Sequence, residues 1–191
     1  MRDGRPAYMR GRSTFKAGNA SEAGVKICQA CAGRFGGPAW VCPSCGWEAE
    51  WHGAYHAVTN SADDIGYSPE FFDHLPAAEA SHFWFAARNA LIAWATRAYF
   101  PAAASFLEVG CGTGQVVGAL RQAIPSLQVT ASEAFPEGLR ITARRAPGVE
   151  LVQADARALP WDAEFDVVGA FAVIEHIAED AAAARQLAQA A

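Results

Sequence analysis

The chain has 191 residues, which is enough for one ordinary domain or for a small domain followed by a medium one. Hydrophobic residues make up 52% of the sequence and recur throughout it, which excludes a chain that is disordered along its whole length. No stretch approaches the roughly 18 uncharged apolar residues that span a bilayer, and no apolar segment follows the charged N-terminus as in a secretory signal. We therefore expect a cytoplasmic protein with no membrane partner.

The net charge of -5 conceals a difference between the two parts of the chain. Residues 1–34 carry seven Lys or Arg against two acids, whereas the remainder carries eight against eighteen. A nucleic-acid-binding protein usually has its basic face on the folded part, which is acidic here. We expect residues 1–26 to form a disordered basic tail, with a phosphate-binding arm as the alternative.

Four of the five cysteines fall into two C-x-x-C pairs, Cys28 with Cys31 and Cys42 with Cys45. Two such turns that face each other form a tetrahedral four-sulfur site, which suits Zn²⁺. Two disulfides are disfavoured in a chain without an export signal, and a redox motif would need no second copy. The spacing predicts a structural zinc ribbon over residues 27–50, closed to substrate.

A ribbon of this size cannot bury a sufficient core, so metal binding would supply its folding free energy. Trp40, Trp47 and Trp51 lie in or beside it. These rings could stack on nucleic-acid bases. They could equally form the ribbon's own small core or dock it on the next domain. The local charge is close to neutral, which favours docking.

Residues 51–80 are typical of a linker with one short helix. Ser68-Pro69-Glu70 is a helix start, and we expect this helix to end before Pro76. A longer helix follows over about 81–100. It is apolar nearly all round, so we expect it to be mostly buried.

From residue 105 the pattern alternates between short apolar strands and helices. We expect strands at 106–109, 127–131, 149–154 and 165–170, and helices at 115–124, 136–145 and 179–190. Such an alternation is typical of βαβ units and predicts an α/β fold with a parallel sheet.

The first of these strands runs into a glycine-rich turn, with Glu108 two places before Gly110, and Gly112 and Gly114 following. The dinucleotide fingerprint G-x-G-x-x-G fails here, because neither register has its third glycine. We expect a Cβ at these glycines to collide with a bound cofactor. A carboxylate repels a diphosphate and attracts an ammonium group, so the turn favours a cofactor with a cationic amino-acid end.

Residues 107–114 resemble motif I of the class I S-adenosylmethionine-dependent methyltransferases, and the resemblance extends over residues 82–191. It implies a Rossmann-like sheet with these strands in the order 3-2-1-4, in a domain over 81–191 that binds S-adenosylmethionine. By the same resemblance Glu133 holds the ribose hydroxyls, and Asp155 with Ala156 reads the adenine. Trp84 and Arg88 on the lead-in helix, and Phe171 after the fourth strand, complete the implied cofactor contacts.

Several of these residues also have a structural interpretation that involves no ligand. Glu133 and Asp155 could each be a solvated acid at the end of a strand, although their sequential order favours the cofactor roles. Cys111 is expected to be a small filler in the turn. His176 is expected to be a packed structural residue, with a general base as the alternative. Some relatives bind a divalent metal through E-x-x-E-H, but Ala172 replaces the first acid here, so no metal is expected at that place.

The family's sheet has further strands beyond the fourth, where this sequence stops. We therefore expect the strand at 165–170 to be an uncovered edge, in a chain that is truncated or is completed by a partner, with weak cofactor binding at best. A small-molecule methyl acceptor is the favoured partner. The alternatives are an RNA-modifying or RNA-binding protein that uses ribbon and tail, and a non-catalytic cofactor-binding fragment.

Overall fold

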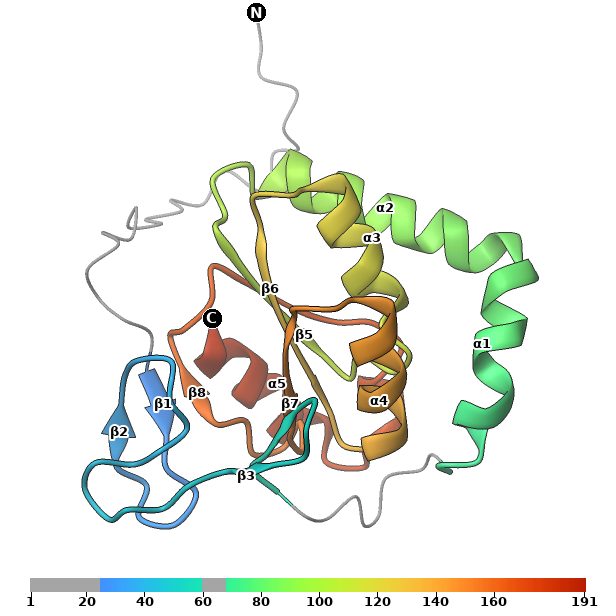
Figure 1. Cartoon of the computed structure of the whole chain (residues 1–191). Helices are drawn as coiled ribbons and strands as arrows, with labels where there is room; N and C mark the ends of the chain where they lie inside the picture. Colours follow the sequence, from blue (N-terminus) through green and yellow to red (C-terminus); the bar gives the residue numbers. More distant parts are fainter. Residues whose placement is uncertain (1–24, 60–67) are drawn as a thin grey trace, which may run out of the picture.

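The computed structural model describes residues 25–59 and 68–191, apart from the side chains of residues 80 and 81 (Figure 1). The expected basic tail lies outside the described residues except for its last two positions. Within the described part of the chain, no helix is long and apolar enough to cross a bilayer.

A six-stranded sheet forms the centre of the fold, in the order β3-β4-β7-β6-β5-β9. Its strands are β3 (Glu50–Trp51), β4 (His56–Ala57), β7 (Glu150–Gln153), β6 (Gln128–Glu133), β5 (Ser105–Val109) and β9 (Val167–Ala170). All neighbours are parallel except the β3–β4 hairpin. The last four strands confirm the predicted order 3-2-1-4, and β9 lies at an edge as expected.

Helices cover the two faces of this sheet unequally (Figure 1). On one face α2 (Phe83–Tyr99), α3 (Gln115–Ala123) and α4 (Pro136–Arg145) pack over a core that includes Phe106, Leu120 and Leu139. On the other face the helix is α5 (Asp180–Ala190), which packs with Leu107 and Val109. The alternation of Phe106 and Leu107 between the two cores is the expected consequence of strand geometry.

The cysteine-rich segment covers the rest of that second face. Its strands β1 (Val25–Ile27) and β2 (Arg34–Phe35) form a small antiparallel sheet with β8 (Trp161–Asp162), a strand that follows β7 in the chain. Trp40 is 2% exposed, lies in the same core cluster as Leu107, and donates from Nε1 to Glu150 Oε1 at 2.9 Å. The predicted docking is therefore confirmed for Trp40, whereas Trp51 is 57% exposed. We call residues 25–49 the four-cysteine module.

The stretch expected to be a linker begins with the hairpin that extends the main sheet. Its Tyr55 is 2% exposed, and β4 pairs in parallel with β7. No alternating pattern marks these strands in the sequence, because each of them has only two residues. The strand β8 also has only two residues, so the sequence pattern did not predict it either.

Two helix predictions are wrong. The helix α1 (Phe71–Ser81) contains Pro76 instead of ending before it, and no side chain caps its start. Proline removes one internal hydrogen bond, but the buried Phe72 and Glu79 hold the helix on both sides of it. In α2 only Asn89, Ala93 and Thr96 are buried, so this helix is mostly exposed rather than buried.

Candidate cofactor and metal sites

A cavity of about 280 Å³ opens at the carboxyl ends of the parallel strands β5, β6, β7 and β9, the usual location of ligands in such sheets. It brings together nine of the ten predicted cofactor-binding residues: Trp84, Arg88, Glu108, Gly110, Gly112, Glu133, Asp155, Ala156 and Phe171. Gly114 does not line it. The helix α1 closes one side with Phe72, Leu75 and Glu79.

The three glycines of the turn all adopt positive φ, which explains their identity without a ligand. A Cβ on Gly110 would lie 2.4 Å from Val173 Cγ2, and one on Gly114 would lie 2.6 Å from Thr142 Cγ2. Only a Cβ on Gly112 would point into open space. Packing against the protein itself thus accounts for Gly110 and Gly114, and the expected collision with a cofactor stays a prediction.

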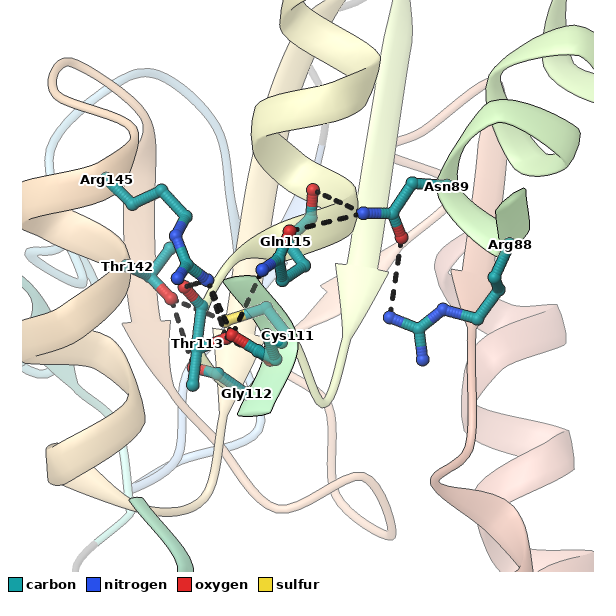
Figure 2. Close-up of polar contacts among 9 residues, drawn as sticks. Arg88, Asn89, Cys111, Gly112, Thr113, Gln115, Thr142 and Arg145 are labelled. Carbon is teal, nitrogen blue, oxygen red and sulfur yellow. Dashed lines mark hydrogen bonds and ion pairs between the residues drawn. The ribbon is translucent and has the colours of Figure 1, made fainter. Parts of the chain in front are cut away.

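Side chains from three helices hold this turn in place (Figure 2). Thr113 Oγ1 donates to the buried carboxylate of Glu79, with 2.5 Å to Oε1, and Arg145 Nη1 donates to Glu79 Oε2 at 3.0 Å. Arg145 Nη1 also donates to the Thr113 carbonyl at 2.8 Å, and Gln115 Nε2 donates to Glu79 Oε2 at 3.1 Å. Thr142 Oγ1 donates to the Gly112 carbonyl at 3.1 Å. Because the turn is held by protein groups, its N–H groups are fixed before any ligand arrives.

Two polar atoms, one a hydrogen-bond acceptor and one a donor, are buried in this cavity without a partner: Glu108 Oε2 and Arg88 Nε. Burial raises the pKa of Glu108 to about 8, while the charge of Arg88 opposes that rise. The Arg88 guanidinium lies over the ring of Trp84, 4.9 Å from its centroid. Buried polar groups are normally paired, so these atoms fit a ligand that carries both an ammonium and a carboxylate group.

The carboxylate of Glu133 faces the glycine turn at the end of β6. Its Oε2 accepts from Gly112 N at 2.8 Å, and its Oε1 accepts from Ala134 N at 2.8 Å and from Phe135 N at 3.2 Å. Burial raises the pKa of Glu133 against the effect of these N–H groups. Each carboxylate oxygen can accept two hydrogen bonds, so Oε2 retains capacity for a ribose hydroxyl.

Asp155, after β7, is already engaged within the protein. Arg157 donates to it from backbone N (2.7 Å to Oδ1), from Nε (3.0 Å to each oxygen) and from Nη2 (2.7 Å to Oδ2). Burial raises the pKa of Asp155, but the Arg157 hydrogen bonds outweigh it and the net shift is downward. Arg157 Nη1 also donates to Glu179 at 2.9 Å, which ties this loop to the start of α5.

His176 ends the short helix η2 (Ile174–His176), is exposed, and lines the cavity. It is therefore not the packed residue that we expected. The neighbouring Ala172 has φ +59°, a conformation that costs a non-glycine residue free energy and is frequent at functional sites.

The sulfur atoms of the four predicted ligands form one cluster, all within 4.8 Å of one another. Cys28 Sγ lies 3.6 Å from Cys45 Sγ, and Cys31 Sγ lies 3.8 Å from Cys42 Sγ. Zn–S bonds of about 2.3 Å at tetrahedral angles place sulfurs about 3.8 Å apart. The cluster fits Zn²⁺, and the separations are too long for disulfides.

Both C-x-x-C turns have the same backbone. Cys28 N donates to Gly33 O and Cys28 O accepts from Ala32 N, each at 2.9 Å; in the second turn Cys42 N donates to Trp47 O at 2.8 Å and Cys42 O accepts from Gly46 N at 2.9 Å. The fourth residue after the first cysteine has positive φ in both: Ala32 at +56° and Gly46 at +74°.

Sequence reasoning missed three residues that shape the cavity. No sequence pattern marked Glu79, because its partner Thr113 is 34 residues away. None marked Arg157, because it pairs with Asp155 within an irregular loop. Gly138 did offer a local signal, as a glycine in the first turn of α4. A Cβ there would lie 2.6 Å from the Gly112 carbonyl, so it permits close packing of the helix on the turn.

Comparisons with known proteins agree with this geometry. Residues 106–191 match the family model of a methyltransferase domain. No curated protein is significantly similar in sequence.

Among solved structures, the chain resembles SAM-bound CalS10, an amino pentose methyltransferase from Micromonospora echinaspora involved in calicheamicin biosynthesis, with 30% identity, a TM-score of 0.53, and coverage of 62% of this chain and 51% of that one. It also resembles the sugar N-methyltransferase KedS8 from Streptoalloteichus, with 25% identity, a TM-score of 0.50, and coverage of 71% and 53%. DesVI of Streptomyces venezuelae shares the fold at 22% identity and a TM-score of 0.50, with coverage of 65% and 53%. The chain thus spans about half the length of these proteins. Residues 106–191 thus carry a methyltransferase domain of the class I S-adenosylmethionine-dependent type.

Proposed function

We propose that this chain binds S-adenosylmethionine in the cavity at the strand ends and transfers its methyl group to a small-molecule acceptor. The observation that carries the proposal is the buried pair of unpartnered atoms, Glu108 Oε2 and Arg88 Nε. The amino-acid end of the cofactor has the two charges that would satisfy them.

The remaining roles follow the arrangement of the cavity. Glu133 Oε2 would accept a hydrogen bond from a ribose hydroxyl, while Oε1 continues to accept from the backbone N–H groups of Ala134 and Phe135. Ala156 and Asp155 would contact the adenine, with Arg157 holding the Asp155 carboxylate. Bound S-adenosylmethionine would supply an activated methyl group, and the protein's part is to hold the acceptor in line with it and to exclude water.

His176 is the proposed acceptor of the proton that an amine or hydroxyl nucleophile loses. The exposed position of His176 at the cavity supports this role, because the molecule that receives the methyl group must enter from solvent. The resemblance to an amino pentose methyltransferase and a sugar N-methyltransferase makes amino sugars the first acceptor class to test.

We also propose that the four-cysteine cluster holds a structural Zn²⁺ ion. The S···S separations and the matching turns support it, and four thiolate ligands leave no open coordination position for catalysis. An RNA-binding role for the module gains no support from Trp40, which is buried against the sheet.

Calorimetric titration with S-adenosylhomocysteine tests the cofactor assignment. We expect saturable one-site binding by the full chain, with Glu133→Ala weakening it by about tenfold or more. The matched control is Glu137→Ala on the neighbouring helix, whose carboxylate lies outside the cavity and pairs with Arg140 at 3.5 Å. Equal affinity in both variants would contradict the assignment, as would a preference for NAD. For the acceptor, S-adenosylhomocysteine formation is measured with amino sugars and with an RNA oligonucleotide.

A further inference from the structure

The segment that carries the proposed adenine contacts, residues 155–160, is attached to the four-cysteine module at its far end. Ile27 N, on β1, donates to Pro160 O at 2.9 Å. On the other side Leu159 N donates to Gln186 Oε1 on α5 at 3.0 Å. The segment therefore runs between the module and α5, and Figure 1 shows β8, which continues it, beside β1.

The contact continues along β8. Lys26 lies opposite Trp161 in the antiparallel pairing of β1 with β8. The Trp40 ring meets the Trp161 ring edge-on, with centroids 5.8 Å apart, and Arg34 forms an ion pair with Asp162 at 2.8 Å. Trp161 is 1% exposed, so the module supplies part of the environment that buries it.

The module has few internal chain interactions to hold its own shape. Its hairpin pairs only two residues of β1 with two of β2, too few for independent stability. Cys28 follows directly after β1, and its N–H and C=O groups close the first metal-binding turn. We therefore expect order in β1 to depend on order at the four cysteines, for which a metal ion would supply the free energy.

We propose that metal binding at the four cysteines positions the 155–160 segment and thereby raises the affinity of the cavity for the adenosine part of its cofactor. The inference rests on the proposed function. None of the described residues of the module lines the cavity, so the coupling is indirect: β1 holds Pro160 and β8, and a pre-ordered segment binds its ligand with a smaller loss of entropy.

The test compares the zinc-loaded full chain with the same chain after its metal is removed by a chelator. Titration with S-adenosylhomocysteine measures affinity, and hydrogen exchange measures the protection of residues 156–162. We expect metal removal to weaken binding by about tenfold and to speed exchange in that segment, while β5 and β6 stay protected. Unchanged affinity and unchanged exchange would overturn the proposal.

A second variant covers the case in which metal removal unfolds the whole chain. Trp40→Phe keeps all four cysteines and an aromatic ring but removes the indole N–H that donates to Glu150, and Trp51→Phe is the same substitution at an exposed position. In zinc-loaded protein we expect faster exchange in residues 156–162 and weaker binding in the first variant alone. Identical behaviour of the two variants would contradict the coupling. If zinc-loaded protein binds no S-adenosylhomocysteine, the proposed function fails, and the exchange difference alone still decides whether the module positions the segment.

Discussion

The hydroxyl of Thr113, in the glycine turn, donates a hydrogen bond to the buried carboxylate of Glu79, 34 residues earlier on α1. The Glu79 side chain is 4% exposed and also pairs with Arg145. One carboxylate therefore joins the helix that closes the cavity to the turn at its base and to the end of α4.

We expect Glu79→Ala to lower the free energy of unfolding by about 3 kcal/mol, because it leaves Thr113 and Arg145 without their acceptor in a buried place. Urea denaturation measures the change. Asp73→Ala, at an exposed acid of the same helix, is the matched control and should change stability by less than about 0.5 kcal/mol. Similar values for both variants would show that the network does not stabilise the fold.

Affinity for S-adenosylhomocysteine is expected to rise with pH from about 6 to 8. The pKa of Glu108 is about 8 in the empty cavity, so its carboxyl is largely protonated below that pH and must ionise to bind an ammonium group. Binding therefore releases a proton, and Kd falls by up to about tenfold per pH unit until the carboxyl is ionised. Calorimetry in buffers of different ionisation enthalpy measures the proton release. Glu108→Gln should remove both effects, and a pH-independent Kd in the native chain would contradict the role of Glu108.

The same raised pKa makes Glu108 a destabilising residue of the ligand-free protein. A carboxyl whose pKa rises on folding weakens the folded state as pH increases from its unfolded value, near 4.5, towards 8. Glu108→Gln should therefore increase the free energy of unfolding at pH 7 by about 2 kcal/mol while it weakens cofactor binding. Urea denaturation at pH 5 and pH 7 provides the control, since the gain should be smaller at pH 5.

The two C-x-x-C turns give opposite expectations for the same backbone position. Ala32→Gly should stabilise the zinc-loaded protein by about 0.5 kcal/mol, since alanine at positive φ is strained. Gly46→Ala should destabilise it by about 1 kcal/mol, although a Cβ there would meet nothing within 4 Å. Thermal unfolding with excess zinc measures both. A stabilising Gly46→Ala would mean that backbone strain does not govern these turns.

Neighbouring positions on α2 are expected to respond very differently to charge. Trp94 is 57% exposed and Ala93 is 6% exposed. Trp94→Lys should change the free energy of unfolding by less than about 0.5 kcal/mol, whereas Ala93→Lys should cost about 3 kcal/mol or more. Chemical denaturation of the two variants measures this, and a large loss for Trp94→Lys would restore the expectation that the whole helix is buried.

Local pattern was sufficient for much of this protein. The short apolar strands expected at 106–109, 127–131 and 149–154 predict the parallel sheet, because side-chain burial on both faces leaves a continuous apolar run. Parallel strands end at one edge, so residues that follow them meet there, and nine of ten predicted contacts do line one cavity. The spacing of Cys28, Cys31, Cys42 and Cys45 likewise predicts their cluster, since two tight turns have few ways to face each other.

Tertiary structure alone decided what depends on partners far apart in the chain. Apolar composition could not reveal that α2 presents Trp94 to solvent, because burial is set by which elements pack against a helix. Nor could it reveal that Glu79 reaches Thr113, that Arg157 reaches Glu179, or that Glu150 is the partner of the docked Trp40. Periodicity and spacing record the geometry of one element, whereas a buried charge finds its counter-charge only when the chain has brought separate elements together.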